Sequence, residues 1–235
     1  MSDSLCDIVE TIAQIPQLMP CLEDRLLTTA LSVIGQHANP ELVGLVDQAV
    51  DLVGTVLKQL TPPVNPALIQ AAFPAIVGMM LQTDDLQAMQ NGCDCLRAFV
   101  RAAPAELAQW SDGTLSGYDY IVQVIQRILH PDMDPSASVF IGTFITQFLL
   151  KGVGVTPEMC VAIFTAVLAK LLHLNSARLH NIQGLVFVLA YWINMDPAAA
   201  LNFLAERGAL QVGQPMTHPM PHPMLYPTTH PRLTP

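Results

Sequence analysis

Cysteine residues occur at a spacing in this chain that raises the question of metal or redox chemistry. Cys93 and Cys95 are separated by one residue, whereas zinc and redox motifs use a two-residue spacing, and no second pair follows. The cysteines are odd in number, which is typical of reduced thiols in a reducing compartment. They are Cys6, Cys21, Cys93, Cys95 and Cys160. We therefore expect no metal or redox centre and assign Cys93 to the core.

Carboxylates and histidines offer the next candidates for catalysis. Asp84 and Asp85 could be taken for an acid–base pair, but adjacent residues at a helix start do not face each other. Acids there favour the positive end of the helix dipole, and histidines at helix ends favour the negative end. The histidines of the folded part, three of them at helix ends, are His37, His130, His173 and His180. No Gly-rich phosphate loop, HExxH or G-x-S-x-G motif occurs. We expect no catalytic site, no cofactor and no enzyme.

The last 25 residues have a composition of their own. From Gln211 the sequence contains seven prolines and no acid, so it cannot form a helix interior and has too few apolar contacts to fold alone. We predict a folded part over residues 1–210 and a disordered tail with polyproline character over residues 211–235. His218, His222 and His230 could bind a soft metal, but a low-complexity tail without a site is the simpler interpretation.

Charge is distributed unevenly along the chain. The net charge is −9, and only 12% of the residues are charged while 51% are hydrophobic, which implies extensive burial. Residues 1–120 hold 14 Asp and Glu against four Lys and Arg, a net of −10, whereas residues 121–235 carry a net of +1. An acidic half argues against nucleic acid and for basic partners. The alternative is an acidic surface that serves solubility alone.

Apolar periodicity of three and four residues recurs throughout and predicts an all-α protein. In residues 84–103 the stripe consists of Leu86, Met89, Cys93, Leu96 and Val100, with Thr83 or Asp84 as the expected N-cap. The longest apolar runs fall short of the ~20 residues of a membrane span, and the acidic start does not resemble a signal peptide. Helices are expected at residues 4–16, 20–35, 40–60, 66–82, 84–103, 116–129, 135–152, 157–173, 176–193 and 197–207.

The helices recur at a regular distance. Cap-plus-proline starts occur at 39–40, 65–66, 134–135, 156–157 and 196–197. Helix pairs would then begin near residues 20, 66, 116 and 157, a period of about 40–50 residues that is typical of HEAT or armadillo repeats. We predict a right-handed superhelical solenoid of antiparallel helix pairs; the alternative is a compact bundle. The first and last helices do not look like polar caps, which favours a segment of a longer solenoid or a shortened product.

Four pieces of sequence together resemble a known family. They are QAAFPA at 70–75, TDD at 83–85, MQNG at 89–92 with CLRAFV at 95–100, and AQW at 108–110. Their order and spacing resemble the importin-β (karyopherin-β) superfamily of nuclear transport receptors, most closely its importin nine type. The resemblance covers about residues 5–207 and matches only part of such a receptor.

The resemblance implies a function and partners. Receptors of this family are HEAT-repeat superhelices that carry cargo through nuclear pores, contact pore proteins, respond to the small GTPase Ran, and move between cytoplasm and nucleus. The importin nine type is similar to receptors of very basic cargo such as core histones and ribosomal proteins. The main Ran-binding surface of the family lies in its amino-terminal repeats, so we expect it outside this chain. We expect no nucleic-acid partner and no membrane span.

Acidic side chains on the second helix of each pair are the candidate cargo contacts. The second helix of a HEAT pair usually lines the concave surface, and residues 40–60 and 84–103 are second helices by this count. A surface with several acids attracts a basic partner. The candidates are Glu41, Asp47, Asp51, Asp84, Asp85 and Asp94. The alternatives are a passive scaffold or a shortened inactive product, and an ordinary solvated face on which Asp94 pairs with Arg97.

Overall fold

The computed structural model describes residues 2–174 and 179–209, and these residues form helices with no strand longer than a single bridge. The α-helices are α1 (Ser2–Ala13), α2 (Met19–Cys21), α3 (Thr28–Ile34), α4 (Val43–Lys58), α5 (Pro66–Met80), α6 (Leu86–Ala102), α7 (Pro104–Gln109), α8 (Gly117–Ile128), α9 (Ser138–Lys151), α10 (Pro157–His173), α11 (Leu179–Met195) and α12 (Pro197–Glu206). A π-helical stretch, Leu22–Leu27, joins α2 to α3, and 3₁₀ turns precede α2, α4 and α9. The predicted tail, residues 211–235, and the predicted cap Asn175 lie outside the described residues.

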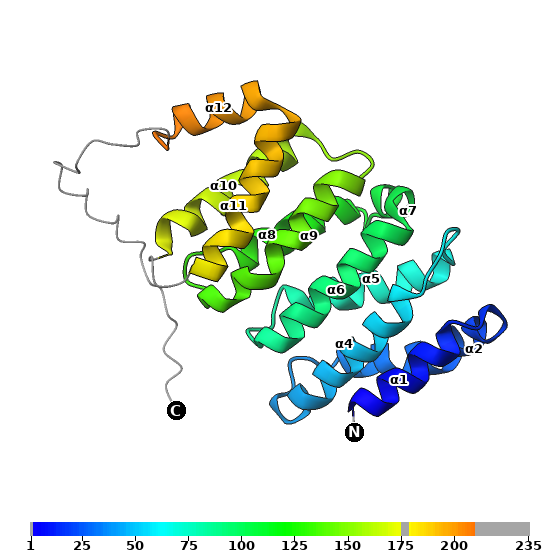
Figure 1. Cartoon of the computed structure of the whole chain (residues 1–235). Helices are drawn as coiled ribbons and strands as arrows, with labels where there is room; N and C mark the ends of the chain where they lie inside the picture. Colours follow the sequence, from blue (N-terminus) through cyan, green and yellow to red (C-terminus); the bar gives the residue numbers. More distant parts are fainter. Residues whose placement is uncertain (1, 175–178, 210–235) are drawn as a thin grey trace.

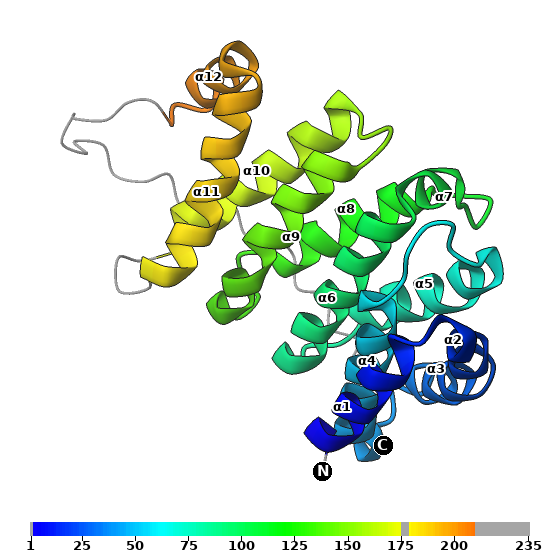
Figure 2. The ribbon, with the colours of Figure 1, turned by 45° about the vertical axis from the view of Figure 1, so that its right-hand side comes forward.

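The helices stack as pairs in two layers (Figures 1 and 2). Helices α3, α5, α8 and α10 form one layer, in which each packs on the next, and α4, α6, α9 and α11 form the other. Helix α1 covers α4 at one end, and α12 packs on α11 at the other. Each helix of a pair therefore contacts its own mate and the corresponding helix of the neighbouring pair, which is the arrangement of a solenoid and not of a compact bundle. The predicted all-α HEAT-repeat solenoid is confirmed, with pairs that begin where the period places them.

Proline and short polar side chains set the helix starts. Asn39, Asn65, Thr156 and Asp196 each cap a helix or turn whose first residue is proline, as predicted. The predicted cap of α6 is wrong. Asp85, and not Thr83 or Asp84, accepts the N–H of Ala88 at 2.8 Å.

Helix α6 lies at the centre of the stack, against α4, α5 and α9. The predicted stripe residues Met89, Cys93, Leu96 and Val100 are buried, and Leu86 is partly buried. Phe99 on a second face is also fully buried. This second buried face was not predicted, because the small residues around it do not stand out as apolar.

Apolar side chains are exposed where the neighbouring helices stop covering a helix. Leu45 of α4 and Val186 of α11, for example, are 49% and 48% exposed. Spacing alone does not show where the neighbouring helices stop covering a stripe. No helix among the residues that the structure places is long and apolar enough to cross a membrane.

A capping box starts α8. The Ser116 hydroxyl accepts the N–H of Asp119, and the Asp119 carboxylate accepts the N–H of Ser116 at 2.9 Å. We expect Ser116→Ala to lower the free energy of unfolding by about 1 kcal/mol, because two amide groups of the first turn lose their partner or its orientation. Chemical denaturation measures this. Ser32→Ala, an exposed serine inside α3, is the control, and an equal loss in both variants would contradict the prediction.

Candidate functional site

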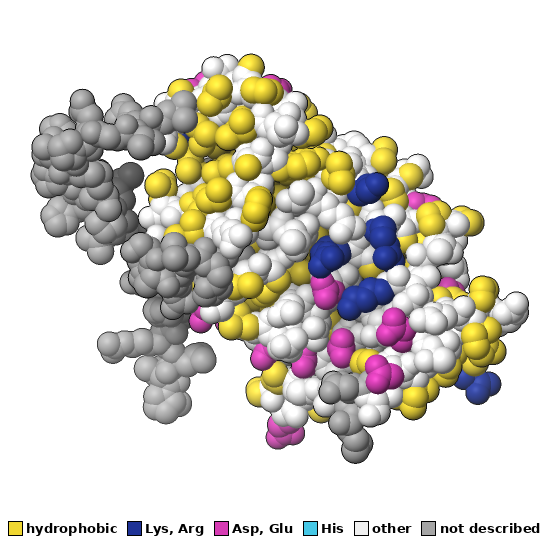
Figure 3. Space-filling model, in the orientation of Figure 1, with side chains coloured by type: hydrophobic (Ala, Val, Ile, Leu, Met, Phe, Trp, Pro, Cys, Tyr) yellow, Lys and Arg dark blue, Asp and Glu magenta, His cyan; other side chains and the backbone are white. Residues whose placement is uncertain are grey.

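The exposed side of the layer formed by α4, α6, α9 and α11, together with α1, carries most of the candidate residues; we call it the second-helix face. Figure 3 views it in the orientation of Figure 1. Acidic side chains gather over α1, α4 and α6, Lys and Arg side chains form a group in the middle, and hydrophobic side chains cover the part over α9, α11 and α12. The face is therefore divided into regions of different chemistry.

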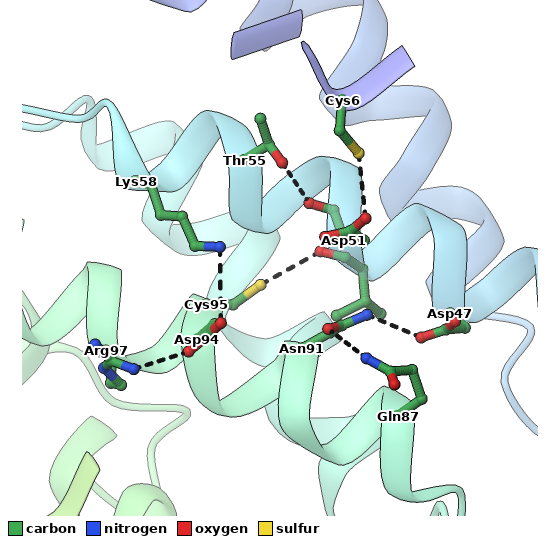
Figure 4. Close-up of polar contacts among 11 residues, drawn as sticks. Cys6, Asp47, Asp51, Thr55, Lys58, Gln87, Asn91, Asp94, Cys95 and Arg97 are labelled. Atoms are coloured by element: carbon green, nitrogen blue, oxygen red, sulfur yellow. Dashed lines mark hydrogen bonds and ion pairs between the residues drawn. The ribbon is translucent and has the colours of Figure 1, made fainter. Parts of the chain in front are cut away.

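Three of the predicted acids lie close together where α4 packs on the start of α6: Asp47, Asp51 and Asp85, which we call the acidic cluster. Asp47 accepts a hydrogen bond from the Asn91 amide at 2.9 Å, and Asp51 accepts one from the Cys6 thiol at 3.2 Å (Figure 4). Asp85 caps α6. Partial burial, and then the charges of Asp85 and Asp51, raise the pKa of Asp47, while the bond from Asn91 opposes this shift. Negative charge is thus concentrated at this point.

No ion pair among the described residues compensates the acidic cluster. In the part of the chain that the structure describes, ion pairs involve Asp84, Asp94 and Asp132, and none reaches the three residues of the cluster. The neighbouring Asn91 is itself held by Gln87, whose amide donates to it at 3.1 Å (Figure 4). Uncharged groups therefore orient Asp47 without neutralising it.

The other three predicted acids have different surroundings. Asp94 pairs with Arg97 at 3.0 Å, the alternative that the sequence offered, and also with Lys58 of α4 at 3.6 Å. Asp84 pairs with Arg127 of α8 at 2.9 Å, so it ties the start of α6 to the other layer. Glu41 is exposed in the turn before α4. The structure thus does not bring Glu41 and Asp84 into the cluster, and it neutralises Asp94.

The two cysteines of α6, Cys93 and Cys95, are core residues. Burial raises the pKa of both the Cys93 and the Cys95 thiol far above the ordinary value, so neither is poised as a thiolate nucleophile or ligand. Cys95 Sγ lies 3.5 Å from the carbonyl oxygen of Val50. Among the described residues no group of three His, Cys, Asp or Glu side chains gathers in a way that could hold a metal ion.

Basic residues converge beside the acids, and none of them is among the predicted site residues. Lys58 of α4 and Arg97 and Arg101 of α6 line one hollow, although residues 1–120 hold only four Lys and Arg. The spacing of four between the two arginines could have indicated a shared helix face. The contribution of Lys58 depends on the register between α4 and α6, which no local pattern gives.

A stack of HEAT-type helix pairs with polar regions on its second-helix face is a class of structure that binds other proteins along an extended surface. No family model matches the chain. The chain is 27% identical over 205 residues to importin-9 of Drosophila melanogaster. The match covers 86% of this chain and 20% of the relative, so the chain spans about a fifth of that protein. This likeness supports a relation to the importin-β family, and it confirms the predicted resemblance.

Proposed function

We propose that the chain serves in nuclear transport as a HEAT-repeat segment that binds basic cargo proteins through the acidic cluster. The relation to an importin supports the transport role, and the two-layered stack supports an extended binding face. The role is binding and not catalysis. The observation that carries the cargo site is the concentration of Asp47, Asp51 and Asp85, which form no ion pair with any cation in residues 2–174 and 179–209.

The charge on Asp47 explains why a basic partner would bind there. Its raised pKa reports unfavourable surroundings for the carboxylate, namely burial and two like charges. A lysine or arginine from a partner would offset both effects, and the attraction would also speed the encounter. Asp94 has its own cations and Asp84 has Arg127, so they contribute less to such a site.

The cargo class and the transport cycle extend this proposal. Core histones and basic ribosomal proteins are the class of cargo with the required charge, and the cycle would involve Ran, pore proteins and both cytoplasm and nucleus. These assignments rest on the relation to importin-9, and the chain covers only a fifth of the length of that relative. Residues 1–210 are proposed as the binding part.

Replacing both Asp47 and Asp51 by asparagine tests the cargo site. We expect the affinity for a purified core-histone dimer at low salt to fall about tenfold, and its salt dependence to flatten, because two uncompensated charges are removed. Fluorescence anisotropy over a salt series measures both quantities. The matched control is Asp24→Asn with Glu206→Gln, which removes two exposed charges elsewhere.

Two outcomes would overturn this proposal. Equal affinities for the Asp47/Asp51 variant and the control variant would show that only the net charge matters. Wild-type binding that does not change between low and high salt would exclude an electrostatic site. Either result would favour the passive scaffold or inactive product.

A further inference from the structure

A basic hollow of about 320 Å³ opens on the second-helix face between α4, α6 and α9. The proposed cargo site does not use it. Its lining consists of Lys58, Asp94, Arg97, Ala98, Arg101 and Gln147. Three cations face one carboxylate, so the hollow keeps an excess of positive charge inside an otherwise acidic part of the protein.

The cations of the hollow are held in place but not satisfied. The Lys58 and Arg97 side chains are 50% and 41% exposed, and both share the single carboxylate of Asp94. Arg101 donates to the backbone carbonyl oxygen of Lys58, which keeps its guanidinium beside the hollow. The Nε of Arg97 is buried and has no hydrogen-bond partner among the described residues. An anionic group would therefore find preplaced donors here.

An apolar groove of about 740 Å³ continues from this hollow along α9 and α11. Gln147 lines both, so the two form one surface, which we call the bipartite groove. Leu150 of α9 and Phe187 of α11 line the apolar part and are 58% and 62% exposed. Figure 3 shows the corresponding change from Lys and Arg to hydrophobic side chains across the face. Exposed apolar side chains gathered in a groove mark an interaction site.

We propose that the bipartite groove binds a linear segment of a partner protein in which carboxylates lie beside large apolar side chains. The carboxylates would pair with Lys58, Arg97 and Arg101, and the apolar side chains would cover Leu150 and Phe187. Charge-assisted hydrogen bonds would place the acidic part of the segment over α4 and α6, and apolar burial would hold the other part against α9 and α11. This site lies apart from the acidic cluster and selects a partner of opposite charge, so it goes beyond the proposed function.

Charge and apolarity together select this occupant over others. Residues 211–235 of the chain contain no Asp or Glu, so they offer nothing to the basic part. A nucleic acid has the charge for the hollow, but its phosphates do not match an apolar groove and would approach the acidic cluster. A second copy of this acidic chain would bring its own excess of negative charge, −9, to the same face.

Anisotropy with a labelled synthetic peptide, in which a run of glutamates precedes leucine and phenylalanine, tests the groove on the full chain. We expect saturable binding that weakens about tenfold in Lys58→Gln/Arg101→Gln and similarly in Leu150→Ser/Phe187→Ser.

The matched controls are Arg25→Gln and Leu172→Ser, which change exposed residues elsewhere and should leave affinity unchanged. Peptides with glutamine for glutamate, or serine for the apolar residues, should also bind about tenfold more weakly. Circular dichroism verifies that each variant is folded. Asp47→Asn, which changes the acidic cluster, should not weaken the binding of this peptide.

Several results would overturn the proposal. Absence of peptide binding, or equal binding to the groove variants and the controls, would remove the site. Single-stranded DNA that binds more tightly than the peptide would make the hollow a general polyanion site. Displacement of the probe by a synthetic peptide of residues 211–235 would assign the groove to the chain's own tail. A dimer in sedimentation that Leu150→Ser/Phe187→Ser dissociates would assign it to a second copy.

Discussion

Replacing Lys170 by alanine is expected to lower the free energy of unfolding by about 3 kcal/mol, the largest effect of any single polar side chain here. Lys170 lies on α10, and none of its surface is exposed. Its ammonium group donates to the carbonyl oxygens of His130 at 2.9 Å and Met133 at 2.7 Å, in the connection between α8 and α9. The substitution would leave these two carbonyl oxygens without their charged donor and would open a cavity where the buried lysine side chain lies.

Chemical denaturation measures the free energy of unfolding of Lys170→Ala, and two further variants separate the effect of the ammonium group from that of packing. Lys170→Met keeps the apolar length of the side chain but removes the donors, so most of the loss should remain. Lys151→Ala removes an exposed lysine of α9 and should change stability by less than about 0.5 kcal/mol. A methionine variant as stable as the wild type would show that packing, and not the ammonium group, holds the α8–α9 connection.

The helix pairs could be predicted from the sequence because their signals are local. Cap-plus-proline starts such as Asn65-Pro66 fix where a helix begins, and apolar spacing fixes which side of it is buried. Lys170 could not be predicted in the same way. It stands in the last turn of α10, where a lysine ordinarily complements the helix dipole in solvent, and its partners come from a distant connection.

The residues of the candidate site could likewise be predicted only where local spacing places them together. Asp47 and Asp51 are four residues apart on one helix, so their common face could be read from the spacing. The approach of Asp85 to Asp47, and of Lys58 to Asp94, arises only when α4 packs on α6 in one register. The sequence therefore predicted that acids occur on the second helices, but not which of them are neutralised.

Helix polarity explains why opposite charges can lie so close on one face. The acidic cluster has Asp85 at the cap of α6, and the basic hollow has Arg101 in the last turn of the same helix. Lys58 likewise lies in the last turn of α4. Asp85 at the start of α6, and Lys58 and Arg101 in the last turns of α4 and α6, are each favoured by the helix dipole. Because both helices run side by side, these charges line up into two regions that partners of opposite charge can distinguish.

Replacing Gly142 by alanine is expected to lower the free energy of unfolding by about 2–3 kcal/mol, although alanine is the better helix former. Gly142 of α9 faces Gly184 of α11. A Cβ at residue 142 would lie 2.5 Å from the carbonyl oxygen and 2.9 Å from the carbonyl carbon of Gly184. Both are backbone atoms, so no side chain can turn aside, and the two helices would have to separate.

Gly78→Ala is the matched control for this substitution. Gly78 lies inside α5, and nothing comes within 4 Å of a Cβ there, so alanine should raise the free energy of unfolding by about 0.5–1 kcal/mol. Tryptophan fluorescence measures the unfolding, because Trp110 precedes α8 and Trp192 lies on α11, where its ring stacks on Phe164 with centroids 3.7 Å apart. Stabilisation by both alanines would disprove the close contact of α9 and α11. Opposite signs would confirm it, and Gly142→Ala should then also weaken binding in the bipartite groove, because α9 and α11 form its walls.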